Sequence, residues 1–136
     1  MNATAQKVKG LIIEHLRDHF EGEELSVVDA KAITQIDLPL IAVDIVYSEA
    51  HSPALPQVYN LTVEITLRTH AGDQSENAEG WKDSIESLTN DASGMMAIIQ
   101  DQGVIPFQWL CSGAIEEWNE NIVETRFSSA LICGRA

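Results

Sequence analysis

A strict alternation of apolar and polar side chains near the middle of the chain limits most strongly what this sequence can fold into. The apolar members are Tyr59, Leu61, Val63, Ile65 and Leu67, and they alternate with Asn60, Thr62, Glu64, Thr66 and Arg68. Successive side chains of a β-strand point to opposite faces of a sheet, so a period of two predicts a half-buried strand. One face of this strand must pack on a core, while the other meets solvent or a neighbouring molecule.

Other segments are expected to complete a sheet around this strand. Residues 38–47 and 122–133 are each predicted to be a strand, because apolar side chains again recur at every second position. In the second of these segments one face carries Phe127, Ser129, Leu131 and Cys133. Residues 105–111 and 114–118 are expected as two shorter strands around Ser112-Gly113. Residues 27–36 fit a short strand followed by a loop.

Three polar segments are expected to connect these elements. Pro53 and Pro56 predict a loop over residues 48–57, since proline interrupts regular strand pairing. Residues 71–74 and the acidic residues 116–121 are each predicted to form a turn.

Two segments have the apolar spacing of helices. Residues 3–20 repeat apolar side chains at helical intervals, and residues 75–101 are predicted to form a long helix with one continuous apolar stripe. The stripe consists of Trp81, Ile85, Leu88, Ala92, Met95 and Ile99. Asp73 with Glu76 resembles a capping box at its start, and Gly103 stops it. Gly94 lies inside the predicted helix, where it fits a bend or a close approach of another element.

The order helix, strands, long helix, strands predicts a single α+β domain over residues 1–136. The sheet is expected to be antiparallel or mixed, with the two helices packed on one face. The other face and the edge strands would remain available to neighbouring molecules.

The chain of 136 residues has eight basic and 21 acidic side chains, a formal net charge of −13. Between residues 69 and 125 the only basic residue is Lys82. Tight binding to a phosphate backbone needs several Lys or Arg contacts, so this composition excludes a DNA clamp. The acidity is explained first by simple solubility, and it also suits a surface past which DNA must slide. No apolar run approaches the about 20 residues of a membrane-spanning helix, so no membrane partner is expected.

Three groups of side chains could carry chemistry, and each has a structural explanation that is favoured. His15 and His19 are one helical turn apart and could share a metal ion, but both are expected to be partly buried between helix and sheet. Cys111 could be a nucleophile with His51 or His70 as base, but its acidic surroundings disfavour a thiolate. The four carboxylates of Glu116, Glu117, Glu120 and Glu124 lack the spacing of a calcium loop. We therefore expect a protein that is not an enzyme, with no catalytic, cofactor-binding or metal-binding residue. Both cysteines are expected as free thiols in a reducing compartment.

The order of elements resembles the tail-terminator and tail-completion proteins of long-tailed bacteriophages, including the lambda-type minor tail proteins. The matching features are the helix over residues 3–20, the Pro-led strand entry at residues 37–43, the alternating strand at 59–67, the long helix with Trp81 and the closing strand at 125–132. The likeness is one of architecture, length and acidity, over about residues 3 to 133.

This resemblance implies a virion structural protein that forms a homo-oligomeric ring, commonly a hexamer. Such a ring caps the tail tube and joins it to the head–neck region. Its partners would be further copies of itself, the tail tube protein and head–neck connector proteins, and DNA would pass through the lumen without specific binding. The location would be the tail or neck of the virion, and the host cytoplasm during assembly.

Loops are the expected contact regions, since loops carry binding more often than strands do. The candidate interaction residues are Glu49, His51, Pro53, Leu55, Asp73, Glu117, Trp118 and Glu120. For Trp118 two interpretations stay open: an aromatic side chain in a polar segment can anchor a partner, and it can equally be a half-exposed loop residue packed on its own domain. Three other functions remain open from the sequence: another head–tail connector or tail-tube-like subunit, a small cytosolic enzyme or ligand-binding domain, and an adaptor domain.

Overall fold

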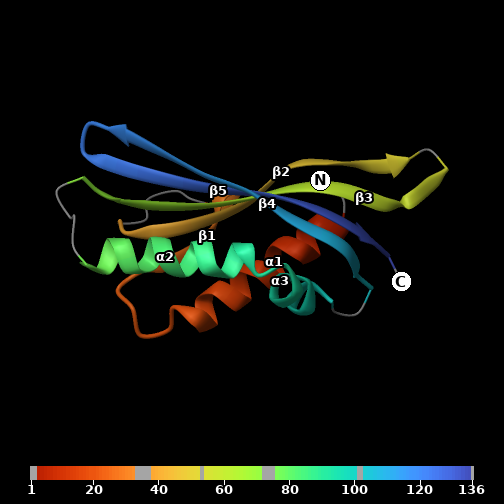
Figure 1. Ribbon diagram of the computed structural model, residues 1–136, viewed down its shortest axis with the longest axis horizontal. Helices are drawn as coiled ribbons and strands as arrows, with labels where there is room; N and C mark the ends of the chain where they lie inside the picture. Colours follow the sequence, from red (N-terminus) through yellow and green to blue (C-terminus); the bar gives the residue numbers. More distant parts are fainter. Residues whose placement is uncertain (1–2, 33–37, 53, 72–75, 101–102, 136) are drawn as a thin grey trace.

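The computed structural model describes residues 3–32, 38–52, 54–71, 76–100 and 103–135, and it shows a mixed β-sheet with helices on one face (Figure 1). In chain order the elements are α1 (Ala3–His19), β1 (Ser26–Asp29), a short 3-10 helix (Ala30–Ala32), β2 (Leu40–Ser52), β3 (Leu55–His70), α2 (Glu76–Asn90), α3 (Ala92–Ile99), β4 (Ile105–Asn119) and β5 (Ile122–Gly134). The five strands lie in the order β1-β2-β3-β5-β4, with β1 parallel to β2 and the other neighbours antiparallel. The α+β class predicted from the sequence is confirmed.

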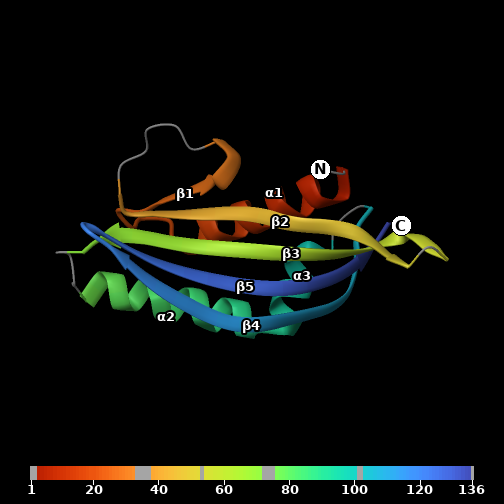
Figure 2. The same cartoon turned by 90° about the horizontal axis from the view of Figure 1, so that it is seen from above.

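The alternation along β3 divides the sheet into a covered and an open face. Leu61, Val63 and Ile65 are buried beneath the helices, and the polar residues between them point to the opposite face. α1 lies against β1 and β2, while α2 and α3 lie against β4 and β5. Figure 2 shows β4 and β1 at the two edges of this sheet. The prediction of a half-buried strand is thus confirmed.

The predicted long helix is interrupted at Asp91. α2 ends at Asn90 and α3 begins at Ala92, because the Asp91 side chain accepts a hydrogen bond of 3.1 Å from the backbone N–H of Gly94 and so caps a new helix. A Cβ at position 94 would collide with the Asp91 carboxylate, so glycine is needed there for the cap. The apolar stripe continues across the break, with Ile85, Met95 and Ile99 all buried.

One predicted loop is largely strand, and two predicted short strands form a single strand. β2 and β3 continue as paired arms through most of residues 48–57, with Glu49 opposite Asn60 and Ser52 opposite Leu55. The two short strands expected around Ser112 form one strand, β4. Ser112 is the extra residue of a β-bulge, since Cys111 pairs with Ser129 and Gly113 with Ser128.

The predicted acidic turn is also shorter than expected. β4 continues to Asn119, which leaves Glu120 and Asn121 as the turn into β5. The predicted turn at residues 71–74 and its capping-box residue Asp73 lie mostly outside the described residues. Among the helices of the described segments, none has the length and apolar character needed to cross a membrane.

Candidate functional site

The two histidines of α1 do not form a buried pair. His15 is half-buried, but His19 is exposed and its ring contacts Phe20 edge-on at a centroid distance of 4.9 Å. The expectation that both lie between helix and sheet is therefore wrong for His19, which is near the end of α1 where the helix leaves the sheet. Within the described residues, no three His, Cys, Asp or Glu side chains are grouped so that they could hold a metal ion.

Neither cysteine is placed beside a histidine base. Cys111 pairs with Ser129 of β5, whereas His70 pairs with Ile122, seven residues or about 23 Å further along that strand. His51 lies on β2, three strands away from Cys111 across the sheet. Cys133 is fully buried, and that burial raises the pKa of its thiol to about 11. The register thus separates the residues that a thiol–imidazole pair would need.

Three of the four clustered carboxylates are engaged by basic side chains instead of facing one another. Glu117 pairs with Arg126 at 2.8 Å and Glu124 with Arg68 at 3.0 Å, both on the open face of the sheet. On the covered face, Lys82 of α2 lies 3.5 Å from Glu116. Partial burial works to lower the pKa of Lys82, but the carboxylates of Glu116 and Glu79 outweigh it and raise that pKa. This pair ties α2 to the edge strand β4.

The candidate interaction residues that the structure describes fall at two opposite ends of the molecule, and the candidate Asp73 lies outside the described residues. In the antiparallel register of β3 and β5, His70 pairs with Ile122 and Val58 with Gly134. The β4–β5 turn is therefore at one end of the sheet, and the β2–β3 turn is at the other (Figure 1).

At the β2–β3 end, Glu49 and His51 are exposed, and the His51 ring is 2.9 Å from the side-chain oxygen of Asn60. A hydrogen bond to Glu49 raises the pKa of the exposed Tyr47 phenol. The backbone of Leu55 begins β3, while Pro53 lies outside the described residues.

At the β4–β5 end, Glu117, Trp118 and Glu120 lie together within a few residues of the turn. Glu120 is exposed and has a positive φ of 46°. Trp118 is 60% exposed and pairs with Val123. The carbonyl of Asn121 accepts a 2.8 Å hydrogen bond from the N–H of Ala71, which joins the turn to the end of β3.

An apolar row along the edge strand was not predicted. We call it the β4 surface, and it consists of Ile105, Phe107, Leu110 and Ile115. Phe107, Leu110 and Ile115 are 56%, 60% and 61% exposed. Leu110 and Ile115 pair with Ala130 and Arg126, which alternate with the buried residues of β5, so they project from the open face. The sequence does contain a signal for this surface. Residues 105–111 have apolar side chains at both odd and even positions, so both faces of this strand are apolar although it lies at the edge of the sheet.

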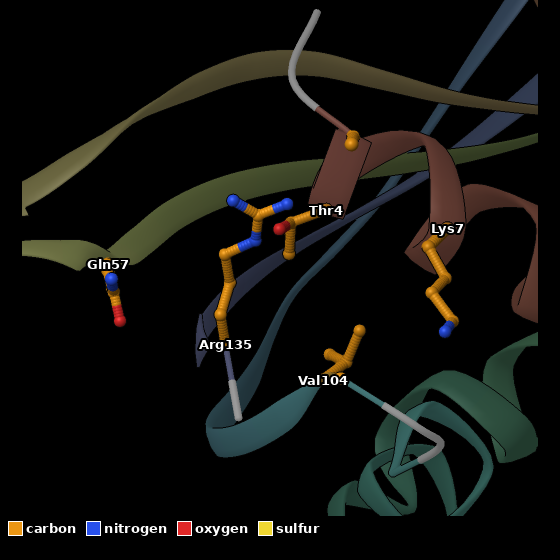
Figure 3. A pocket seen from close by; sticks show the side chains of 7 residues that line it. Thr4, Lys7, Gln57, Val104 and Arg135 are labelled. Carbon is orange, nitrogen blue, oxygen red and sulfur yellow. The ribbon is translucent and has the colours of Figure 1, made fainter.

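A pocket of about 400 Å³ lies at the end of the molecule opposite the β4–β5 turn (Figure 3). Its described lining comes from the first turns of α1, the start of β3, and the residues that flank β4 and β5. The lining residues are Ala3, Thr4, Lys7, Gln57, Gly103, Val104 and Arg135. Among the described lining residues, the charged side chains are those of Lys7 and Arg135. Sequence reasoning missed the pocket because its residues are scattered over the whole chain.

Comparison with known proteins adds no relative: no protein-family model matches this chain, and no curated protein sequence matches it. The arrangement of the described residues is therefore the basis for assigning a role. It shows no grouping of the proposed catalytic or metal-binding side chains, and it places an exposed apolar row on an open strand edge.

Proposed function

We propose that this protein is a structural subunit that assembles into a ring with copies of itself, as a tail-terminator or tail-completion protein of a long-tailed bacteriophage. The observation that carries the proposal is the β4 surface. Its three most exposed side chains are Phe107, Leu110 and Ile115, all on the edge strand of the sheet. Leu110 and Ile115 project from the face opposite the core. Exposed apolar residues grouped in this way are typical of a surface that another protein covers.

The chemistry of β4 supports contact with a partner. Edge strands are commonly protected by lysine side chains, and β4 contains neither Lys nor Arg over its fifteen residues. Its hydrogen-bonding edge is interrupted by bulges near Phe107 and Ser112. The surface is therefore suited to side-chain packing by a neighbour more than to the addition of one long strand.

The charge of the chain agrees with a ring through which DNA passes. Six copies would carry about −78 charges, six times the net charge of −13, and such a field disfavours adhesion of a polyanion. Ring contacts are heterologous, so each subunit must present two different, complementary surfaces. The two ends of this sheet differ in shape and charge, which meets that requirement. The order of helices and strands resembles that of tail terminators, and this resemblance is the reason for proposing a phage tail ring in particular.

The test is the oligomeric state of the purified protein, alone and with tail tubes, measured by light scattering and negative-stain imaging. The wild type is expected to form rings, alone or on the ends of tubes. Leu110→Lys, which places a charge in the middle of the β4 surface, is expected to weaken association at least about tenfold. Ser87→Lys is the matched control, because it adds the same charge at an exposed position of α2. A wild type that remains monomeric and ignores tubes, or rings unaffected by Leu110→Lys, would contradict the proposal.

A further inference from the structure

The exposed large apolar side chains of the described residues lie toward two opposite edges of the sheet. Val46 and Tyr47 of β2 are 48% and 50% exposed, and the others lie on β4 or at the start of β5. β4 is one edge strand. At the other edge, the pairing of β1 with β2 runs from Leu40 to Val43, and Figure 2 shows β2 extending well beyond β1. Within the described part of the chain, each copy therefore has two different apolar edges.

One cross-strand row of side chains connects these two edges. Tyr47 pairs with Thr62, which pairs with Ala130 of β5. Ala130 in turn pairs with Leu110 of β4. Thr62 alternates with buried residues of β3, so the whole row projects from the open face. Tyr47 and Leu110 are thus at the same level of the sheet, at its two edges.

Further contacts hold the side chains near the two ends of this row. The ring of Phe107 lies over Gly134, because a Cβ at this glycine would be 3.0 Å from the ring. That Cβ would project from the open face, since Gly134 follows a buried residue of β5, so Phe107 lies on the same face as Leu110. On β2, the Tyr47 phenol donates a hydrogen bond to the carboxylate of Glu49. Both edges therefore present oriented aromatic side chains.

The charge of the chain restricts where two copies can touch. Each copy carries a net charge of −13, and like charges placed opposite each other disfavour a contact. Residues 105–115 of β4 and residues 45–48 of β2 contain no charged side chain. Both strands also contain two bulges, which favour packing of side chains over continuous backbone pairing. The two apolar edges are thus surfaces on which copies can approach closely.

We propose that the β4 surface of one copy packs against Val46 and Tyr47 at the β2 edge of the next copy, with Leu110 beside Tyr47. This inference rests on the proposed ring-forming function and names its contact. Three successive antiparallel pairings separate β2 from β4 within one copy. Copies set side by side at the same level therefore place β4 antiparallel to the neighbouring β2. Such a contact between unlike edges is heterologous, as a ring requires, whereas β4 against β4 would end at a dimer.

A charge exchange between the two positions tests this contact. Tyr47→Glu and Leu110→Lys are each expected to weaken ring association at least about tenfold, because each places an unpaired charge in every contact. The double variant Y47E/L110K has opposite charges side by side and is expected to associate at least about fivefold more tightly than either single variant. Ser87→Lys, at an exposed position of α2, is the control and is expected to leave the rings intact. Light scattering measures association, and circular dichroism with thermal unfolding checks that each variant keeps the fold.

Chemical cross-linking identifies the neighbouring surface directly. The background is Cys111→Ser, which removes the partly exposed thiol, while Cys133 is fully buried. Tyr47→Cys copies mixed with Leu110→Cys copies are expected to form dimers with a short bismaleimide, and neither variant alone is expected to do so. A chain with both substitutions is expected to give a ladder of products that ends at the closed ring.

The outcomes separate this contact from the proposed function. Dimers formed by Leu110→Cys alone would show β4 against β4 and overturn the contact. Rings that form without a cross-link between positions 47 and 110, or a double charge variant no better than the single ones, overturn the contact while leaving the ring function standing. A wild type that never forms rings overturns both.

Discussion

At the scale of single residues, the Lys9–Asp29 ion pair is the clearest case of a polar contact that fixes an element. Lys9 is 3% exposed inside the helix–sheet layer, and its ammonium group is 3.0 Å from the Asp29 carboxylate at the end of β1. Partial burial would raise the pKa of Asp29, but the Lys31 backbone N–H and the Lys9 ammonium outweigh it and lower that pKa below its ordinary 3.8. The pair therefore anchors α1 on the short edge strand.

We expect Asp29→Asn to lower the free energy of unfolding by about 1–3 kcal/mol at pH 7, because it leaves a buried ammonium group without its counter-charge. The folded-state pKa of Asp29 is depressed, so this stabilisation is present above about pH 4 and is lost as the pH falls through the folded value. The difference between wild type and variant is thus expected to shrink toward pH 2. Urea unfolding at several pH values measures it. Asp83→Asn, at an exposed position of α2, is the control. A difference that stays constant with pH would contradict the assignment.

Two buried tryptophans allow a second comparison. The indole N–H of Trp109 donates a 2.8 Å hydrogen bond to the Thr89 carbonyl in the last turn of α2, where carbonyls lack helical partners. Trp109→Phe is expected to lower stability by about 2–4 kcal/mol, through the lost bond and a small cavity. Trp81 is similarly buried, but its N–H has no acceptor among the described residues. Trp81→Phe should therefore have the smaller effect in the same urea measurement. The opposite order would show that the Thr89 bond contributes little.

At the scale of elements, the break between α2 and α3 depends on a glycine. Glycine inside a helix is normally about 1 kcal/mol less favourable than alanine. At position 94, however, a Cβ would displace the Asp91 carboxylate and remove the cap of α3, which is worth a similar amount. In Gly94→Ala, the gain in helix propensity and the loss of the Asp91 cap therefore have opposite effects on the free energy of unfolding.

We expect Gly94→Ala to leave the stability nearly unchanged. In an Asp91→Ala background, where no cap remains to be lost, the same substitution is expected to stabilise by about 1 kcal/mol. Gly80→Ala is the control, since a Cβ there meets nothing within 4 Å in α2, and it should stabilise by about 0.5–1 kcal/mol. Thermal unfolding of the four variants of this double-mutant cycle supplies the coupling energy. Additive effects at positions 91 and 94 would contradict the role given to the cap.

How much of an element could be predicted depended on whether its signal was local. The β3 alternation and the α1 spacing predict their elements because each pattern reports one buried face. The break at Asp91 was missed because the apolar stripe keeps its helical spacing from Ile85 to Met95, and an aspartate within a helical pattern does not by itself reveal a cap. The 48–57 segment was predicted as a loop from its two prolines, but in the structure its arms pair at the end of a two-stranded extension.

The residues of the candidate site likewise divide into those with a local sequence signal and those without one. Glu117, Trp118 and Glu120 were predicted from local composition; Glu117 and Trp118 lie on the last residues of β4, and Glu120 lies in the turn that follows. The pocket of Lys7 and Arg135 joins residues from the two ends of the chain, so no local pattern could reveal it. The β4 surface was hidden because the edge position of β4 follows from the strand order and not from its own sequence.

At the scale of the whole molecule, the net charge of −13 must oppose the compact state. The folded subunit can be treated as a charged sphere of roughly 18 Å radius. Salt that shortens the Debye length from about 21 to about 4 Å screens the repulsion between its charges. Because the unfolded chain is more expanded and less affected, the folded state gains on the order of 4 kcal/mol in stability. Salt also weakens the ion pairs, but exposed pairs contribute only about 0–1 kcal/mol each. The relief of the repulsion between like charges should therefore exceed the stability lost from the weakened ion pairs.

Raising sodium chloride from about 20 to about 500 mM is accordingly expected to raise the melting temperature of the subunit by about 5 °C or more. The Leu110→Lys variant at low protein concentration is the suitable sample, because under the proposed function its association is weakened and its melting then reports the folding of the subunit. Replacing Glu21, Glu23 and Glu24 by Gln removes three exposed charges. It should raise the melting temperature at low salt and reduce the further gain from added salt. A melting temperature that falls with salt would mean that the ion pairs, and not the self-repulsion, dominate the electrostatics of this fold.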